Sequence, residues 1–156
     1  MMVIPVINEG ATSQNGYLPV DATWYSVYDY AYGTKVNGGN SNFSALNDSL
    51  IPVFVRGGYI IPRKRPDVTT TASRQREFQL LVALDKNNKA NGELYWDDGD
   101  SVVDDISTYN NYRFEFSFSA QAQSSTLNIT RTNKASCNDG VVQSDRIFED
   151  PLVHVY

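Results

Sequence analysis

NYRFEFSFS, residues 111–119, alternates aromatic and polar side chains without a break. One set of alternate positions holds Tyr112, Phe114, Phe116 and Phe118, and the other holds Arg113, Glu115, Ser117 and Ser119. Successive side chains of a β-strand point to opposite faces of its sheet. The pattern therefore predicts a strand with one aromatic, buried face and one polar, solvent-facing side.

The segments on either side of this strand favour the same kind of structure. Runs rich in β-branched and aromatic residues predict strands at 3–7, 17–20, 23–30, 50–55, 59–61, 77–84, 93–96, 125–131 and 152–156. No segment keeps a helical period over three turns. We predict an all-β, antiparallel, sandwich-like fold of about nine or ten short strands.

Glycine and proline mark the expected breaks in the first half of the chain. Asn15-Gly16 predicts a turn, and the Gly-, Asn- and Ser-rich stretch 33–47 predicts a loop or a wide hairpin connection. Gly57-Gly58 predicts a tight turn or bulge, where a positive φ carries little cost. Pro62 and Pro66 are expected to end the strand at 59–61, because proline cannot donate to a ladder.

Polar segments mark the breaks in the second half. Residues 67–73 predict a linker between two parts of the chain. A turn at 85–88 predicts that 93–96 pairs back on 77–84 as a hairpin. The basic run Arg63-Lys64-Arg65 is expected to be a solvated edge.

Composition excludes several classes of protein. The 156 residues are 41% hydrophobic and 20% charged, which allows a packed core. The net charge of −5 argues against nucleic acid as the main partner, and no apolar run approaches the length that crosses a bilayer. Cys137 is the single cysteine, so neither a disulfide framework nor a thiolate metal cluster is expected. The opening MMVIPVINEG lacks a charged region and is broken by Pro5, so it does not predict a signal peptide.

The acidic stretch GELYWDDGDS, residues 92–101, allows three interpretations. Asp97, Asp98 and Asp100 do not have the spacing of a helix-loop-helix calcium site, although a looser site that adds Asp104 and Asp105 stays open. Adjacent side chains of an extended chain point apart, so Asp97 and Asp98 cannot flank one glycosidic bond. The stretch is best explained as a turn at a strand end.

Four ordered blocks resemble the C-terminal region of glycoside hydrolase family 31, most closely that of its eukaryotic α-glucosidases. The blocks are VRGGYIIP at 55–62, TTTASRQ at 69–75, LLVALD at 80–85 and GELYWDDG at 92–99. VIPVI at 3–7 and Trp24-Tyr25 extend the resemblance, with Ser26 in place of the family's usual aspartate. The family-motif residues, expected to be structural, are Trp24, Tyr25, Arg56, Gly57, Gly58, Tyr59, Pro62, Trp96, Asp97, Asp98 and Gly99.

The resemblance implies a non-catalytic fragment of such an enzyme. Family members are retaining α-glucosidases that act on malto-oligosaccharides, glycogen or related sugars, with catalytic aspartates on a (β/α)₈ barrel. The matching region has no barrel, so no catalytic residue and no cofactor is carried over, and the chain alone is expected to be inactive. Residues 1–75 would form the proximal β-sandwich domain and 76–156 the start of a truncated distal one. Their expected partner is the missing barrel.

Two further expectations concern sugars and location. Asn42, Asn47 and Asn128 begin candidate N-glycosylation sequons, a number close to chance for this composition. The resemblance places the parent in the secretory pathway, whether lysosomal, extracellular or membrane-anchored. The alternative function is a stand-alone carbohydrate-binding or adhesion module, in which Tyr25, Tyr28, Tyr30 and Tyr32 would stack on sugar rings. A third option is that the chain retains hydrolase activity.

Overall fold

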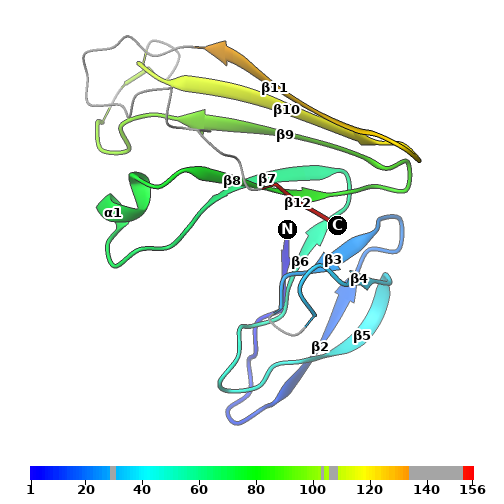
Figure 1. Ribbon diagram of the computed structural model, residues 1–156. Coiled ribbons are helices and arrows are strands. Elements are labelled where there is room, and N and C mark those ends of the chain that lie inside the picture. Colours follow the sequence, from blue (N-terminus) through cyan, green and yellow to red (C-terminus); the bar gives the residue numbers. More distant parts are fainter. Residues whose placement is uncertain (29–30, 103, 106–108, 134–152) are drawn as a thin grey trace. The chain divides into compact units, whose positions relative to one another are not determined.

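The computed structural model describes residues 1–28, 31–102, 104–105, 109–133 and 153–156 (Figure 1). Strands dominate these residues, which contain one α-helix, the short α1 (Thr70–Arg74). The predicted all-β fold is confirmed. The chain divides into two compact units: unit 1 is Met1–Tyr59 with Ala83–Ala90 and Val155–Tyr156, and unit 2 is Ile60–Val82 with Asn91–His154.

Unit 1 contains two sheets. The first has the order β1 (Met2–Val3), β6 (Val53–Arg56), β3 (Trp24–Ser26) and β4 (Lys35–Val36). The second pairs β2 (Ser13–Leu18) with β5 (Gly39–Ser44) in antiparallel register. Leu18 of the second sheet packs in one buried cluster with Trp24 and Phe54 of the first and with Ile4, and the rings of Phe43 and Phe54 lie 4.7 Å apart. Unit 1 is therefore a small sandwich of two sheets.

Two expected breaks in unit 1 are strands instead. Asn15-Gly16 lies inside β2, and the stretch 33–47 contains both β4 and β5. Gly16 lets the buried side chain of Ile4 pack directly against the backbone of β2, where a Cβ would overlap the end of that side chain. A glycine inside a strand often marks such a close approach rather than a turn.

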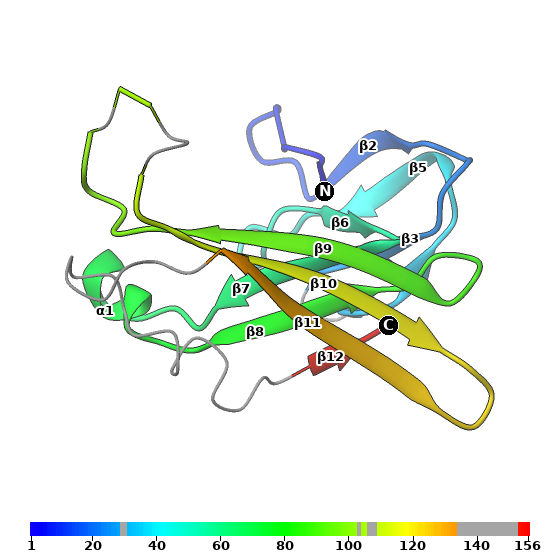
Figure 2. The same cartoon turned by 90° about the horizontal axis from the view of Figure 1, so that it is seen from above.

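Unit 2 holds most of a six-stranded sheet. The strand order is β11 (Ser125–Asn133), β10 (Tyr112–Ala120), β9 (Lys89–Trp96), β7 (Tyr59–Lys64), β8 (Phe78–Ala83) and β12 (Val153–Val155). In Figures 1 and 2, strands β9 to β11 lie over β7 and β8, so the sheet folds over on itself.

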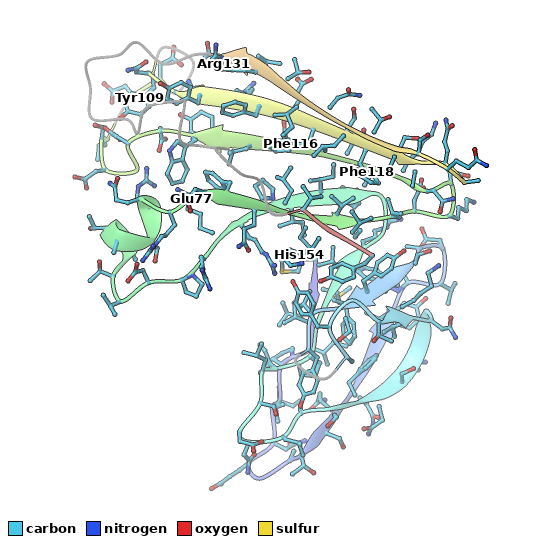
Figure 3. All side chains as sticks on the ribbon, in the orientation of Figure 1. Glu77, Tyr109, Phe116, Phe118, Arg131 and His154 are labelled. Atoms are coloured by element: carbon cyan, nitrogen blue, oxygen red, sulfur yellow. The ribbon has the colours of Figure 1, made fainter. Side chains whose placement is uncertain are left out.

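The alternation in β10 is confirmed. Tyr112, Phe114, Phe116 and Phe118 are all buried, whereas Arg113 and Glu115 are exposed. Figure 3 shows Phe116 and Phe118 on the side of β10 that faces β7 and β8. The aromatic side chains of this one strand therefore fill the space inside the folded sheet, and their burial is a main source of its stability.

Two sequence-based expectations for unit 2 are wrong. β9 does not pair back on β8, because β7 lies between them. Gly92 permits this insertion, since a Cβ there would overlap the carbonyl oxygen of Ile60 in β7. Pro62 lies within β7 and does not end it. Proline removes a single N–H from a ladder, and the strand continues to Lys64 through the remaining groups.

The expected linker at 67–73 contains α1. Thr69 caps the helix, with its Oγ1 accepting the N–H of Ala72 at 3.1 Å. The carboxylate of Asp67 accepts two hydrogen bonds from the Arg76 guanidinium, at 2.6 and 2.9 Å. These hydrogen bonds all lie within residues 67–76, so the segment forms an ordered local structure. The domain boundary at residue 75 stays a prediction; it falls between β7 and β8, which are neighbours in one sheet.

Candidate functional site

The predicted structural residues lie in two groups, one in each unit. Trp24, Tyr25, Arg56, Gly57 and Gly58 lie in unit 1, with Tyr59 at its end. Trp96, Asp97, Asp98 and Gly99 lie in unit 2, and Pro62 lies in β7 of that unit. We call the first group the Leu84 junction, because Tyr25, Gly57 and Gly58 lie around the backbone of Leu84. We call the second group, together with Lys64, Arg74 and Phe78, the Trp96 cluster.

At the Leu84 junction, β3 and the β6–β7 turn contact the backbone of residues 83–84. The Tyr25 hydroxyl donates to the carbonyl oxygen of Leu84 at 2.8 Å, and the Gly58 N–H donates to that of Ala83 at 2.8 Å. A Cβ on Gly57 would overlap the Leu84 carbonyl oxygen, and Gly58 has a φ of +94°. Each position thus requires glycine for a different reason. Position 57 lies too close to another backbone for a side chain, and position 58 has a left-handed conformation.

Electrostatics keep Tyr25 suited to this donor role. Burial raises the pKa of its hydroxyl, and the negative charge of Asp85 raises the pKa further. The phenol therefore stays protonated at neutral pH and can donate. The neighbouring Trp24 donates its indole N–H to the carbonyl of Pro19 at 2.9 Å, and Arg56 forms an exposed ion pair with Asp21 at 3.1 Å. The exposed pair adds little stability.

In the Trp96 cluster, two cations lie on one indole ring. The Lys64 Nζ is 4.2 Å from the centroid of Trp96 and 4.3 Å from that of Phe78, and the Arg74 guanidinium carbon is 3.9 Å from the Trp96 centroid. The Phe78 and Trp96 rings meet edge to face at 5.1 Å. Cations over ring faces are attracted by the aromatic quadrupole, which offsets part of the repulsion between Lys64 and Arg74.

The same cations bind backbone carbonyls. Lys64 donates to the carbonyl oxygens of Arg74 and Arg76 at 2.7 and 2.8 Å. Arg74 donates to the carbonyl of Asp97 at 2.5 Å, and Gly99 leaves room for its guanidinium, which a Cβ would contact. Lys64 ties β7 to the end of α1, and Arg74 ties α1 to the acidic turn. Lys64 is half-buried, so the expectation of a solvated edge is wrong for this residue.

The pKa of Lys64 yields a test of this packing. Burial, and then the charge of Arg74, lower the pKa to about 8, while Glu77 opposes them. The unfolded chain keeps the ordinary pKa of 10.5 and so binds more protons between about pH 8 and 10.5. We therefore expect the contribution of Lys64 to stability to be constant below about pH 8 and to increase from there to about pH 10.5.

Chemical denaturation of the wild type and of Lys64→Met across this pH range measures the difference. The wild type should gain stability relative to the variant as the pH rises, and ¹³C NMR of methylated lysines should show one titration near pH 8 that Lys64→Met removes. Parallel stability curves, with no such titration, would contradict the buried position of Lys64.

The acidic turn satisfies its own carboxylates. Asp97 accepts the N–H of Gly99 at 2.8 Å, and Gly99 has a φ of +72°. Asp98 accepts from the N–H groups of Asp100 and Ser101 and from the Ser101 hydroxyl, the last at 2.6 Å. Hydrogen bonds from Ser101, Tyr109 and the backbone hold the pKa of Asp98 well below its usual value, and the bond to Asp98 raises the pKa of Tyr109. Figure 3 shows Tyr109 at the end of the sheet where β9 ends.

These contacts favour the turn interpretation of residues 97–101. A general acid for glycoside hydrolysis needs a raised pKa, and that of Asp98 is lowered. Within the described ranges, no group of three or more His, Cys, Asp or Glu side chains is placed to hold a metal ion. What the arrangement does chemically is to fix the exit of β9 against α1.

The candidate sugar-related residues differ in exposure. Asn42, Asn47 and Asn128 are all exposed. Tyr25 and Tyr28 are buried, so they cannot stack on a sugar, and Tyr32 is 37% exposed with its ring edge-on to Tyr156 at 5.5 Å. Tyr30 and Cys137 lie outside the described residues.

Lys64, Arg74 and Phe78 were missed as site residues, although one signal was present. Alternation along β7 places Lys64 on the same face as the buried Ile60. A basic residue in register with a core residue indicates a partly buried stem. The contacts of Arg74 and Phe78 depend on the pairing of β7 with β8, which the sequence did not reveal.

The chain has an all-β fold, and its motif residues hold backbone segments that are distant in sequence against one another. Residues 1–61 match the model of the glycosyl hydrolase family 31 C-terminal domain. The chain belongs to this family, as part of its C-terminal region, and the resemblance seen in the sequence is confirmed.

Curated relatives carry glycosidase names. The chain is 40% identical over 136 residues to human intestinal sucrase-isomaltase, which covers 86% of this chain and 7% of that protein. It is 41% identical over 105 residues to a probable alpha/beta-glucosidase of Aspergillus flavus, covering 65% of this chain and 12% of that protein. The chain therefore spans a small part of the length of these relatives.

Solved structures share the fold. The catalytic subunit of an ER glucosidase II complex matches 78% of this chain, or 13% of that chain, with 27% identity and a TM-score of 0.60. A family 31 dextranase of Flavobacterium johnsoniae matches 88% of this chain, or 17% of that chain, with 23% identity and a TM-score of 0.72. Among the described residues of this chain, no helix has the length and apolar character to cross a membrane.

Proposed function

We propose that this chain is a non-catalytic C-terminal portion of a family 31 α-glucosidase and braces the (β/α)₈ barrel of its parent. The observation that carries the proposal is the match of residues 1–61 to the family's C-terminal domain, in a chain that spans 7% of sucrase-isomaltase. The carboxylates of the acidic turn are occupied by their own backbone, which supports a structural role for them.

Exposed apolar side chains support a covered surface on unit 1. Of the fourteen large hydrophobic residues that are exposed in the described part of the chain, eleven belong to unit 1. Ile7 is 75% exposed and Leu50 57%. A cluster of exposed apolar side chains is typical of a surface that binds a partner, and the proposal rests on those beside strand β1.

The edge of the four-stranded sheet is the best-defined part of this surface. β1 is an edge strand, and Val3, which pairs with Val53, is exposed. The Ile4 N–H donates to the carbonyl of Pro52 at 2.9 Å, which places the exposed Ile51 and Leu50 beside the same edge. An unpaired edge with apolar neighbours tends to associate with another surface. We assign it to the barrel.

The activity and location of the parent follow from the same proposal. The parent would hydrolyse α-1,4-type glucosidic bonds in malto-oligosaccharides, glycogen or related sugars, within carbohydrate metabolism. A secretory-pathway location is supported by the names of an intestinal and an ER relative and by the exposure of all three sequon asparagines. N-glycans on those asparagines would make it a glycoprotein.

A chimera tests the bracing role. Human sucrase-isomaltase would be shortened by the segment that this chain matches, and the chain would be fused in its place. The fusion should restore soluble, sucrose-hydrolysing protein. The variant Val3→Asp/Leu50→Asp should yield at least about tenfold less active protein, because the two carboxylates would be buried against the barrel.

Two controls keep this result interpretable. Val3 and Leu50 are exposed, so the double variant should change the stability of the isolated chain by only about 0.5 kcal/mol per site. The isolated chain should show no turnover of maltose or of a chromogenic α-glucoside. Saturable hydrolysis by the isolated chain, or equal activity of the two fusions, would contradict the proposal.

A further inference from the structure

We propose that the outer face of the β2–β5 ribbon is a binding site for a neutral sugar ring, a role that does not depend on the barrel. This face contains an open hollow of about 530 Å³. Its lining consists of Asn15, Gly16, Tyr17, Asn40, Ser41 and Asn42. The hollow is open to solvent, so a bound sugar ring would keep much of its surface exposed.

Strand register brings the polar side chains of the hollow together. Asn15 pairs with Asn42, and Tyr17 pairs with Asn40, in antiparallel register. All four residues are exposed, whereas Leu18 and Phe43 point to the core. Directly paired and diagonal residues on one face of an antiparallel pair lie within reach of one another. Three amides and one phenol ring therefore share a single patch.

The chemistry of this patch fits an uncharged polyhydroxyl ligand. Each side-chain amide offers two donors and an acceptor. The Asn42 amide donates to the Asn15 Oδ1 at 3.0 Å, which orients both groups. Tyr17 is 52% exposed and presents a ring with an apolar face and a polar tip. The lining contains no charged residue, so neither an anion nor a cation has a counter-charge here.

Two sources of neutral sugar are available to the hollow. One is a free α-glucan, which would bind from solution. The other is an N-linked glycan on Asn42 itself, since Asn42-Phe43-Ser44 is a sequon and Asn42 lines the hollow. In the second case the first sugar residue would lie against Tyr17, in the diagonal position across the ribbon.

The first arm of the test uses the full chain made in bacteria, which attach no glycan. Maltoheptaose is titrated while side-chain amide signals are followed by ¹⁵N NMR. For an open hollow we expect a dissociation constant on the order of 1 mM, with shifts at Asn15, Asn40 and Asn42. Tyr17→Ala and Asn40→Ala should each weaken binding at least about tenfold.

Matched controls lie elsewhere on the surface. Tyr59 is 53% exposed, close to the value for Tyr17, and Asn128 is an exposed strand asparagine in β11. Tyr59→Ala and Asn128→Ala should leave binding unchanged. All four substitutions are at exposed positions, so circular dichroism should show a folded chain in each case.

The second arm uses the chain secreted from glycosylating cells. If the attached glycan occupies the hollow, an endoglycosidase should release it from Asn42 more slowly than from Asn128, and Tyr17→Ala should remove that difference. The proposal is supported by Tyr17-dependent binding in either arm. It is overturned if maltoheptaose moves no amide signal and the Asn42 glycan is released independently of Tyr17. Neither result bears on the barrel chimera, whose variants lie at the β1 edge.

Discussion

Replacing Phe116 by alanine is expected to lower the free energy of unfolding of unit 2 by about 3–5 kcal/mol. The side chain is 3% exposed and lies on the inward face of β10 with three other aromatic residues. Its removal leaves a cavity that the surrounding rigid strands can fill only in part, so the lost burial and the cavity both contribute. A loss of this size is a large fraction of the stability of an ordinary domain.

The two tryptophans allow each unit to be followed separately. Trp24 lies in unit 1 and Trp96 in unit 2, and the chain has two Trp in all. With 5-fluorotryptophan in both positions, ¹⁹F NMR during urea unfolding gives one signal for each. Phe116→Ala should shift the Trp96 transition to lower urea. Glu115→Ala, on the exposed face of the same strand, should change it by at most about 0.5 kcal/mol. Equal effects of the two substitutions would contradict the burial of the aromatic face.

The fold was predictable where one strand carries its own pattern. The alternation of residues 111–119 requires no knowledge of neighbours, because burial on one side of a sheet imposes it directly. The pairing between strands was harder to predict from the sequence. Nothing near Gly92 distinguishes a hairpin back to β8 from a strand that passes to β7, since the deciding contact, with the Ile60 carbonyl, is between residues distant in sequence.

The candidate site shows the same division. Asp-Gly chemistry predicts a self-capped turn, and Asp97 and Asp98 accept backbone N–H groups within two or three residues, as that chemistry requires. Arg74 of α1 binds the turn, and Lys64 of β7 binds the end of α1. The basic run after Pro62 predicts a solvated Lys64, because such a run is ordinarily exposed. The carbonyl partners of Lys64 depend on tertiary structure.

Glycine at position 57 carries the largest expected effect in unit 1. Gly57→Ala should lower the free energy of unfolding of this unit by about 3 kcal/mol, at the upper end of what overpacking costs. The added Cβ would overlap the Leu84 carbonyl oxygen, which is backbone and cannot rotate away. Relief requires residues 83–84 to move from the β6–β7 turn, which would weaken the bonds from Tyr25 to Leu84 and from Gly58 to Ala83.

Gly58→Ala is the matched control, one residue along the same turn. Its Cβ would lie 3.5 Å from the Asp85 Cβ, an ordinary contact, so its cost is the positive φ alone, about 1–2 kcal/mol. The unfolding transition reported by the ¹⁹F signal of Trp24 should therefore move to a lower urea concentration in both variants, and by a larger amount in Gly57→Ala. If Gly58→Ala proved the more damaging of the two, backbone conformation rather than close approach to Leu84 would explain why this turn contains two glycines.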